Sequence, residues 1–381
     1  MYINEKNIQV MKKKITIKDS LKKIFKAISY QIFFYIYGRI ELKNKNIQNN
    51  FFTENLIGFK NDKRNSKYSI INTSNARLYT DRIQDTAIIH NNLLIDKPSF
   101  QLRNNNFDKN INKNIVLRIG TPRIQKKLNG VVVSLLTGGG GNNNYFHWLF
   151  DVLPKIAMLE KCYELNKINY FLCPDLNNWQ LKTLNLLGIK ESKCLSSVKF
   201  RHVKADNIIT TSHPWLKSKN IIHDIENLPL WISKWLRFKY LKKKSNKNFP
   251  KKIYIDRSDS ESNLKDYRYI VNENEVVTFL KNKGFKALRL TDLTFEEEIK
   301  LFNDAKIIVG LQGAGLTNLI WSGKKTKIVE LRSKLTNKLF ENLAKQNNIR
   351  FNKIEAKPLK KIIAKHYGAI KIDIKKLEKI V

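Results

Sequence analysis

One stretch, Lys306–Leu331, constrains the fold more than any other part of the chain. A short β-branched run is followed by the turn GLQGAG from Gly310 to Gly315, by the start of a helix at Ala314–Asn318 and by a second apolar run. Glycines in such a turn can adopt positive φ and let a ligand approach the backbone, and the N-terminal end of a helix attracts anions. The stretch therefore predicts a βαβ unit that binds phosphate at its turn.

An acidic residue follows this turn at the spacing typical of nucleotide-binding sites. Glu330 lies 20 residues after Gly310, the distance at which a carboxylate commonly reaches ribose hydroxyls. The pattern predicts that Gly313, Ala314 and Gly315 bind a diphosphate and that Glu330 binds the ribose. The alternative is a packing turn, with Glu330 merely exposed at the end of a strand.

Regular alternation of strands and helices extends this unit into a larger sheet. The pattern predicts strands at 253–256, 286–290, 306–309, 327–331 and 350–354 and helices at 273–283, 295–304 and 337–347. Thr294 and Glu297 have the spacing of a capping box at the start of one helix. Such alternation is typical of a doubly wound parallel sheet, whose ligands bind at the carboxyl ends of the strands. Arg257 lies at that edge, where it could bind a diphosphate or form an exposed ion pair.

The first half of the chain repeats the order of strand, glycine loop and helix. A buried-strand pattern from Gly130 to Thr137 is followed by four glycines and by Asn143 and Asn144, whose side chains can hydrogen-bond sugar hydroxyls or their own backbone. Only scattered strands are expected from Tyr68 to Gly130. Further strands at 170–173, 198–200 and 207–211 and helices at 176–187 and 225–241 predict a layered α/β domain.

His147 and Asp151 stand four residues apart in the helical run after this loop. On a helix they share a face, so one can act as a base and the other can orient it. The alternative is structural. Asp151 would cap a helix starting at Val152, with Pro154 in its first turn, and His147 would be half-buried and hydrogen-bonded.

Composition sets the broad class of the protein. A length of 381 residues favours two domains with an extra N-terminal segment. The net charge of +38 would attract phosphates, nucleic acid or an anionic membrane, although the lysines are spread along the whole chain, as on a solvated basic surface. Cys162, Cys173 and Cys194 are odd in number and form no CxxC pair, which favours a reducing compartment and makes a zinc site improbable.

The N-terminal region combines lysines with apolar residues. Lys12–Lys26 is lysine-rich, and the apolar run at 27–37 is about half the ~20 residues that a membrane-spanning helix needs. The pattern predicts a helix that lies on an anionic membrane surface or, alternatively, packs on the body of the protein. Residues 43–67 are expected to be a loop or a poorly ordered linker.

Four motifs together resemble glycosyltransferase family 61, whose bacterial members are associated with capsular or surface polysaccharide synthesis. The matching segments are NYFHWLFDVLPKI at 144–156, IYIDRS at 253–258, RYIVNENEV at 268–276, and GLQGAGLTNLIW with IVEL at 310–321 and 328–331. The resemblance implies two Rossmann-like domains facing a cleft, a GT-B-like arrangement, and inverting transfer from a nucleotide-activated sugar. Family members usually carry His where this chain has Gln312, and an Arg-containing serine motif where it has DRS at 256–258. The first 65 residues match nothing in the family.

These observations give an expected organisation and mechanism. Residues 1–65 form a basic helical segment and linker, 66–245 the acceptor-side α/β domain, and 250–381 the donor-binding domain. Asp151 is expected to be the base, with His147 as its partner or as the alternate base, and Arg257 with the N–H groups of Gly313–Gly315 stabilises the leaving diphosphate. No DxD sequence occurs, so neither a metal nor another cofactor is expected. The residues expected to bind the nucleotide or sugar are Gln312, Asn318, Glu330 and Glu273.

The expected partners are a nucleotide-sugar donor, a glycan or lipid-linked glycan acceptor and an anionic membrane surface, without specific nucleic acid. The expected location is the cytoplasm or the cytoplasmic face of the membrane. Two other classes stay open. The charge and the 10% aromatic content suit a nucleic-acid-binding protein, although no recognisable module is present. The glycine turn would suit a nicotinamide-dependent oxidoreductase less well, because it falls late in its domain.

Overall fold

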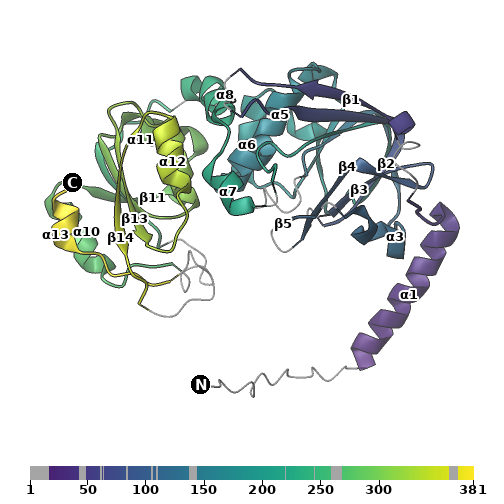
Figure 1. Ribbon diagram of the computed structural model, residues 1–381, viewed down its shortest axis with the longest axis horizontal. Helices are drawn as coiled ribbons and strands as arrows, with labels where there is room; N and C mark the ends of the chain where they lie inside the picture. Colours follow the sequence, from purple (N-terminus) through teal and green to yellow (C-terminus); the bar gives the residue numbers. More distant parts are fainter. Residues whose placement is uncertain are drawn as a thin grey trace.

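The structure, a computed structural model, comprises two α/β units and a helix that projects from one of them (Figure 1). It describes residues 17–42, 49–60, 62, 64–82, 85–103, 106–108, 110–136, 144–218, 220–243, 245–258, 268–359 and 368–381. Each unit is built on its own sheet, of nine strands in the first and five in the second. An α/β class, expected from the sequence, is confirmed.

The first unit contains a mixed sheet in the order β5-β4-β3-β2-β9-β6-β7-β8, with β1 paired to β2. Its strands are β1 (Phe52–Ile57), β2 (Tyr68–Arg82), β3 (Asp85–His90), β4 (Leu93–Arg103), β5 (Asn106–Phe107), β6 (Lys126–Ser134), β7 (Tyr170–Cys173), β8 (Cys194–Ser196) and β9 (His202–Thr211). Strands β1 to β5 are antiparallel, whereas β6 pairs in parallel with both β7 and β9.

Three predictions about the strands and loops of this unit were wrong. The region expected to hold only scattered strands contains the 15-residue strand β2, which lies between β3 and β9. Its pairing of Ile70 with Thr211 joins segments far apart in the chain, so no local pattern signals it. Residues 43–67 are not entirely loop, because they include β1. Finally, 198–200 is a turn, and the strand expected there is β8, a few residues earlier.

Helices cover this sheet on the side of the second unit. They are α4 (Tyr145–His147), the π-helical turn η3 (Trp148–Val152), α5 (Leu153–Leu159), α6 (Asn178–Leu186), α7 (Ile221–Glu226) and α8 (Leu230–Tyr240). The single helix expected at 225–241 is two helices, because Pro229 at the N-cap of α8 stands in extended conformation.

The second unit is the parallel sheet that the sequence predicts. Its order is β11-β10-β12-β13-β14, and every strand pair is parallel. The strands are β10 (Lys252–Asp256), β11 (Lys286–Arg289), β12 (Ile307–Leu311), β13 (Lys327–Ser333) and β14 (Arg350–Ala356). The main helices are α10 (Glu273–Asn282), α11 (Phe295–Asp304), α12 (Leu339–Gln346) and α13 (Ile374–Glu378). The capping box of Thr294 and Glu297 is present.

The glycine turn differs from the expectation in its backbone. None of Gly310, Gly313 and Gly315 adopts the left-handed region, and Gly313 is extended with φ 175°. The segment that follows is a 3-10 helix, η8 (Ala314–Trp321), instead of an α-helix. These glycines serve close packing. A Cβ on Gly310 would come 3.1 Å from Ile255, and one on Gly315 would come 2.8 Å from Leu290.

The two units share one buried apolar cluster, and in Figure 1 the helices α6 to α8 lie on the side of the first unit that faces α11 and α12. The same cluster contains Trp231 and Leu236 from α8 and Phe295 and Trp321 from the second unit. Polar contacts also cross the junction. Arg237 donates to the carbonyl oxygen of Ser322 at 3.1 Å, and the backbone N–H of Lys338 donates to the carboxylate of Glu226 at 2.7 Å. The relative position of the units therefore rests on a packed interface.

Candidate functional site

The segment that carries the predicted pair begins with a side-chain cap and widens into a π-turn. The Asn144 side chain accepts from the N–H of His147 at 3.2 Å and caps α4. Pro154 has no N–H to offer the carbonyl of Phe150, which favours the wider turn at η3. Asp151 lies inside this continuous helix and caps nothing, so the capping alternative was wrong. Asn143 lies outside the described residues.

The structure brings His147 and Asp151 into direct contact. Nδ1 of His147 lies 2.8 Å from Oδ2 of Asp151, and Nε1 of Trp215 donates to Oδ1 at 2.6 Å. Asp151 is 3% exposed, whereas the side chain of His147 is 37% exposed. Both carboxylate oxygens are therefore engaged, and the imidazole is the member of the pair that a substrate can reach.

A second histidine stands behind the carboxylate. Nδ1 of His213 accepts from the backbone N–H of Leu216 at 3.0 Å, so the ring proton of the neutral form lies on Nε2, 3.8 Å from Oδ2 of Asp151. Burial lowers the pKa of His213, although Asp151 opposes this shift. His213 is thus a neutral neighbour that orients the carboxylate.

The surroundings of the pair lower the pKa of Asp151 and raise the pKa of His147. Burial alone would raise the pKa of Asp151, but the charge and hydrogen bond of His147 and the contact with His213 lower it well below its ordinary value. For His147 burial lowers the pKa, and the charge and hydrogen bond of Asp151 outweigh it, so the net shift is upward. An Asp with this shift is a poor base, and a His with this shift is a stronger one.

Lys155, one turn after Asp151, is buried next to the pair. Its ammonium donates to the carbonyl oxygen of Leu136 at 2.5 Å. Burial lowers the pKa of Lys155 to about 7, and the nearby Asp151 carboxylate opposes the shift. The lysine ties the helix to the end of β6, where the glycine-rich loop begins.

Two arginines converge on the glycine turn. Nη1 of Arg257 donates to the carbonyl oxygen of Gln312 at 3.1 Å, and Nη1 of Arg268 lies 3.5 Å from the same oxygen. The strand register accounts for the contact of Arg257 with Gln312, because Ile255 pairs with Gly310 and these two residues each follow two positions later. A Cβ on Gly313 would stand 3.1 Å from the Arg257 guanidinium, so a glycine is needed there. Positive charge therefore collects at the carboxyl edge of the sheet.

Gln312 itself is held inside the turn. It is 5% exposed, its N–H donates to the carbonyl oxygen of Leu331 at 2.9 Å, and its amide oxygen accepts from the hydroxyl of Thr336. The amide is thus oriented by the neighbouring strand and the loop after it.

Asn318 joins the two units instead of facing an open site. Its side-chain oxygen accepts from the hydroxyl of Tyr145 at 2.5 Å and from Nε1 of Trp321 at 2.8 Å, and its amide nitrogen donates to Glu298 at 2.7 Å. Asn318 is fully buried, and burial raises the pKa of Glu298 to about 7. This network packs the helix that carries His147 and Asp151 against η8, next to the glycine turn.

The two predicted carboxylates of the donor set are also engaged. Glu330 is fully buried and receives Nη1 of Arg332 at 3.0 Å, so it is not at an accessible strand end as expected. Its other carboxylate oxygen, Oε1, is buried and has no hydrogen-bond partner among the described residues. Burial raises the pKa of Glu330 to about 7, and Arg332 opposes this. Glu273, in the first turn of α10, accepts from the hydroxyl of Tyr254 at 2.6 Å.

Sequence reasoning missed four residues of this site: Trp215, His213, Lys155 and Arg268. The spacing of Lys155, four residues after Asp151, could have signalled it. His213 and Trp215 come from a loop after β9, about sixty residues away, and nothing local marks them. Arg268 begins a matching motif but lies in no strand or helix.

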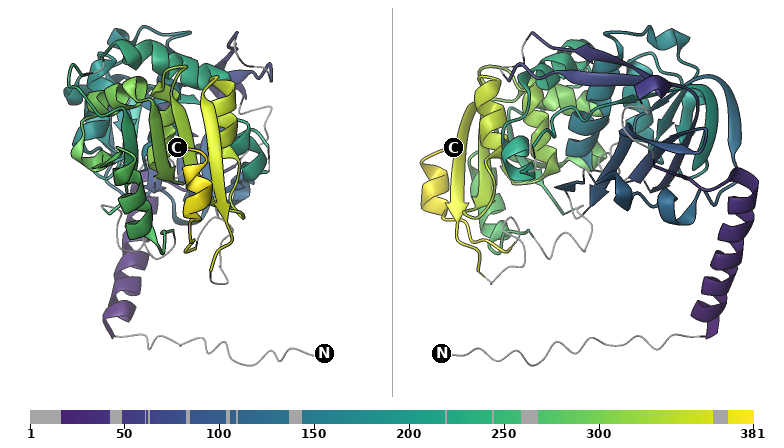
Figure 2. Two further views of the ribbon diagram at one scale, coloured as in Figure 1. Left: turned by 90° about the vertical axis from the view of Figure 1, so that its left-hand side faces the viewer. Right: turned by 45° about the vertical axis from the view of Figure 1, so that its right-hand side comes forward.

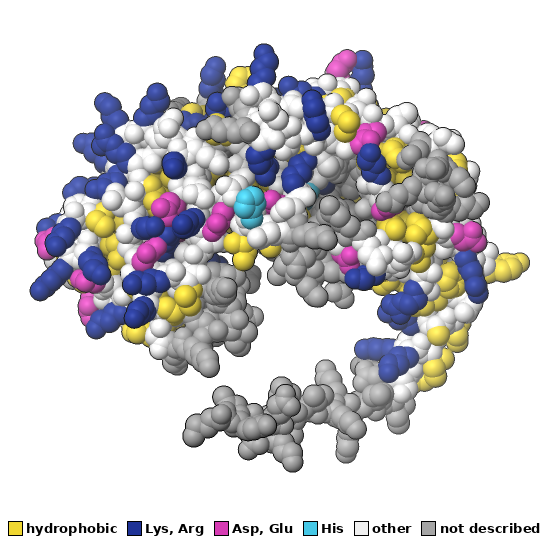
Figure 3. All heavy atoms as spheres, in the orientation of Figure 1, with side chains coloured by type: hydrophobic (Ala, Val, Ile, Leu, Met, Phe, Trp, Pro, Cys, Tyr) yellow, Lys and Arg dark blue, Asp and Glu magenta, His cyan; other side chains and the backbone are white. Residues whose placement is uncertain are grey.

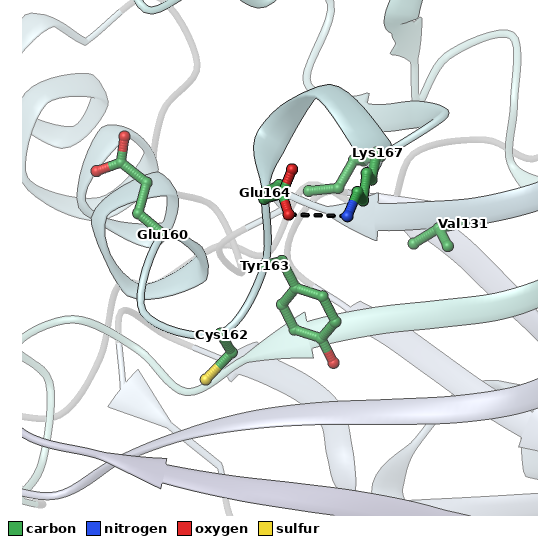
Figure 4. A pocket seen from close by; sticks show the side chains of 7 residues that line it. Val131, Glu160, Cys162, Tyr163, Glu164 and Lys167 are labelled. Carbon is green, nitrogen blue, oxygen red and sulfur yellow. Dashed lines mark hydrogen bonds and ion pairs between the residues drawn. The ribbon is translucent and has the colours of Figure 1, made fainter.

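Two surface hollows lie elsewhere. One, of about 400 Å³, is bordered by Cys162, Tyr163 and the ion pair of Glu164 with Lys167 (Figure 4). Another, of about 660 Å³, lies between α6 and the start of α11. None of the predicted site residues lines either hollow. Among the described residues, no three His, Cys, Asp or Glu side chains are grouped so that they could hold a metal ion.

Comparison with known proteins finds a match in the part of the chain that carries this site. Residues 145–329 match the family model described as Glycosyltransferase 61, a range that contains both the His147–Asp151 pair and the arginine-lined turn. The EGF domain-specific O-linked N-acetylglucosamine transferase of Gallus gallus is 30% identical over 91 residues, which are 23% of this chain and 17% of that relative. The chain thus matches less than a fifth of the relative's length. On the strength of the family match, residues 145–329, just under half of the chain, form a glycosyltransferase family 61 region.

Proposed function

We propose that the protein transfers a sugar from a nucleotide-sugar donor to a hydroxyl group of a glycan acceptor, with inversion at the anomeric carbon. The observation that carries the proposal is the buried Asp151 beside the accessible His147, on a helix packed against the segment after the glycine turn. The family match and the name of the Gallus gallus relative, an O-linked N-acetylglucosamine transferase, support the same reaction class.

In this proposal His147 is the base, and Asp151 takes the orienting role instead of the basic one. Nδ1–H of the imidazole donates to Asp151, which leaves Nε2 to accept the proton of the acceptor hydroxyl as its oxygen attacks the anomeric carbon. The imidazolium that forms is stabilised by the adjacent carboxylate. Trp215 and His213 hold that carboxylate from the other side.

The leaving nucleoside diphosphate needs positive charge where the glycosidic bond breaks. Arg257 and Arg268 supply it at the carboxyl edge of the second sheet, together with the N–H groups at Gly313, Ala314 and Gly315 at the start of η8. This electrostatic stabilisation requires no metal ion, so we propose a metal-independent transfer.

The remaining parts of the proposal concern the architecture and the biological setting. We propose a GT-B-like arrangement, in which the five-stranded unit binds the donor and the nine-stranded unit binds the acceptor. A lipid-linked glycan is the acceptor that fits synthesis of a surface or capsular polysaccharide. Resemblance to the bacterial members of the family supports this setting.

A screen of nucleotide-sugar donors for release of a nucleoside diphosphate tests the proposal. With the donor found, His147→Gln should lower turnover by about 100- to 10,000-fold and leave donor binding nearly unchanged. His223→Gln is a matched control, because His223 also lies beside an aspartate, at 3.5 Å from Asp224, but on an exposed part of α7. Release of diphosphate from no donor, or full activity of His147→Gln, would contradict the proposal.

A further inference from the structure

The helix α1 (Ile17–Tyr37) leaves the body of the protein and carries many exposed apolar side chains. Only its C-terminal end contacts the first unit. There Phe34 packs over Gly120, and the Tyr37 ring lies 4.9 Å from His202 at near right angles. The rest of the helix extends into solvent (Figures 1 and 2).

Seven large apolar residues form one stripe along this helix. At about 100° per residue they fall within about 120° of the helix circumference, on the side away from Tyr37. All are more than half exposed, with Phe25 at 77% and Tyr35 at 94%. Figure 3 shows hydrophobic side chains along the outer margin of this arm, with Lys or Arg side chains beside them. The stripe residues are Leu21, Ile24, Phe25, Ile28, Ile32, Tyr35 and Ile36.

The charges on this helix indicate which kind of partner the apolar stripe binds. From Ser20 to Tyr37 the only charged residues are Lys22, Lys23 and Lys26, all exposed. A second copy of the chain would bring its own lysines, and a second net charge of +38, against them. An anionic surface would instead attract the lysines while the stripe enters an apolar layer.

We propose that α1 is an interfacial helix that binds the headgroup region of an anionic lipid bilayer through its apolar stripe. Aromatic residues such as Phe25 and Tyr35 suit the boundary between headgroups and acyl chains. Lys22 and Lys26 lie about 40° and about 80° beyond one edge of the stripe, from where their ammonium groups can reach the lipid phosphates, whereas Lys23 lies on the polar side of the helix. None of the helices in the described part of the chain has the length and apolarity needed to cross a bilayer, so this helix would lie on the membrane surface.

The experiment is sedimentation of the full chain with vesicles of phosphatidylcholine, with and without one-third phosphatidylglycerol. It needs neither donor nor acceptor, so its result is independent of the proposed transfer. The triple variant Phe25→Gln, Ile28→Gln, Ile32→Gln should lose vesicle binding, because all three side chains are exposed and Gln keeps helix propensity. Its matched control replaces Leu56, Ile124 and Phe238 by Gln, three similarly exposed apolar residues on the body.

A second pair of variants tests the charges. Replacement of Lys22, Lys23 and Lys26 by Glu should weaken binding to the anionic vesicles by about a hundredfold or more. Replacement of the exposed Lys190, Lys199 and Lys204 by Glu changes the net charge equally and should have little effect. Equal losses in both charge variants, or unchanged binding of the apolar variant, would overturn the proposal. A dimer by light scattering that only the α1 variants dissociate would assign the stripe to a second copy instead.

Discussion

Replacement of Asp151 by Asn separates the two roles that the catalytic pair could divide between its members. Asn keeps the shape of the side chain but removes the charge that lies 2.8 Å from Nδ1 of His147. If Asp151 orients and stabilises a basic His147, turnover should fall by about 100- to 10,000-fold, which is about 3–5 kcal/mol of barrier. That loss alone does not identify the base, because either assignment predicts it.

The pH dependence of the rate identifies the base. For a basic His147 the rate falls as pH drops through its pKa, which Asp151 raises above 6.5 against the opposing effect of burial. In Asp151→Asn the carboxylate that raises the pKa of His147 is gone, so the acid limb of the pH–rate profile should move to lower pH. The assay is diphosphate release against pH at saturating donor. If the rate of the natural protein stays constant down to about pH 5, His147 is not the base, because of the two residues only Asp151 ionises below that range.

Asp224→Asn provides the matched control for this experiment. Asp224 is also buried and accepts from the N–H groups of Lys217 and Ser218, both at 2.7 Å, in the loop that carries Trp215. Its replacement should lower stability without moving the acid limb. Asp151→Asn should also lose stability above pH 3.8, because a carboxylate with a depressed pKa stabilises the fold above its unfolded value and loses that contribution on acidification.

Three further predictions concern the second unit. Arg257→Lys and Arg268→Lys should each weaken nucleoside diphosphate binding by about tenfold, because lysine cannot make the bidentate contact of a guanidinium. Calorimetry measures this affinity, and an unchanged affinity in both variants would show that neither arginine binds the diphosphate. Burial raises the pKa of Glu330 from 4.5 to about 7, so the folded state binds this proton more tightly and the free energy of unfolding should fall as pH rises between these values. Glu330→Gln should make the free energy of unfolding, measured by urea titration, less dependent on pH in this range. A tenfold loss of donor affinity in a folded Glu330→Gln variant would instead favour ribose binding by Glu330. Gln312→His should leave the maximal rate similar and add no ionisation to the pH–rate profile, because two arginines already supply positive charge at the turn. A tenfold higher maximal rate together with a new limb of the pH–rate profile near pH 6–7 would contradict a hydrogen-bonding role for Gln312.

The sequence by itself determined the second unit almost completely. Its strands are short apolar runs, the helix α11 begins with the capping box of Thr294, and each connection is local, so propensity and pattern specify them. The pairing of His147 with Asp151 was also predictable, because four residues on a helix place two side chains together even across a π-turn.

Tertiary structure alone decided the roles of the site residues. Burial depends on what packs over a side chain, so only the structure shows that Trp215 closes off Asp151, that Arg332 holds Glu330 and that Asn318 joins the two units. The strand β2 likewise depends on β9, whose partners lie about 140 residues away. Such contacts leave no local pattern in the sequence, because they are made by residues that become neighbours only when the chain has folded.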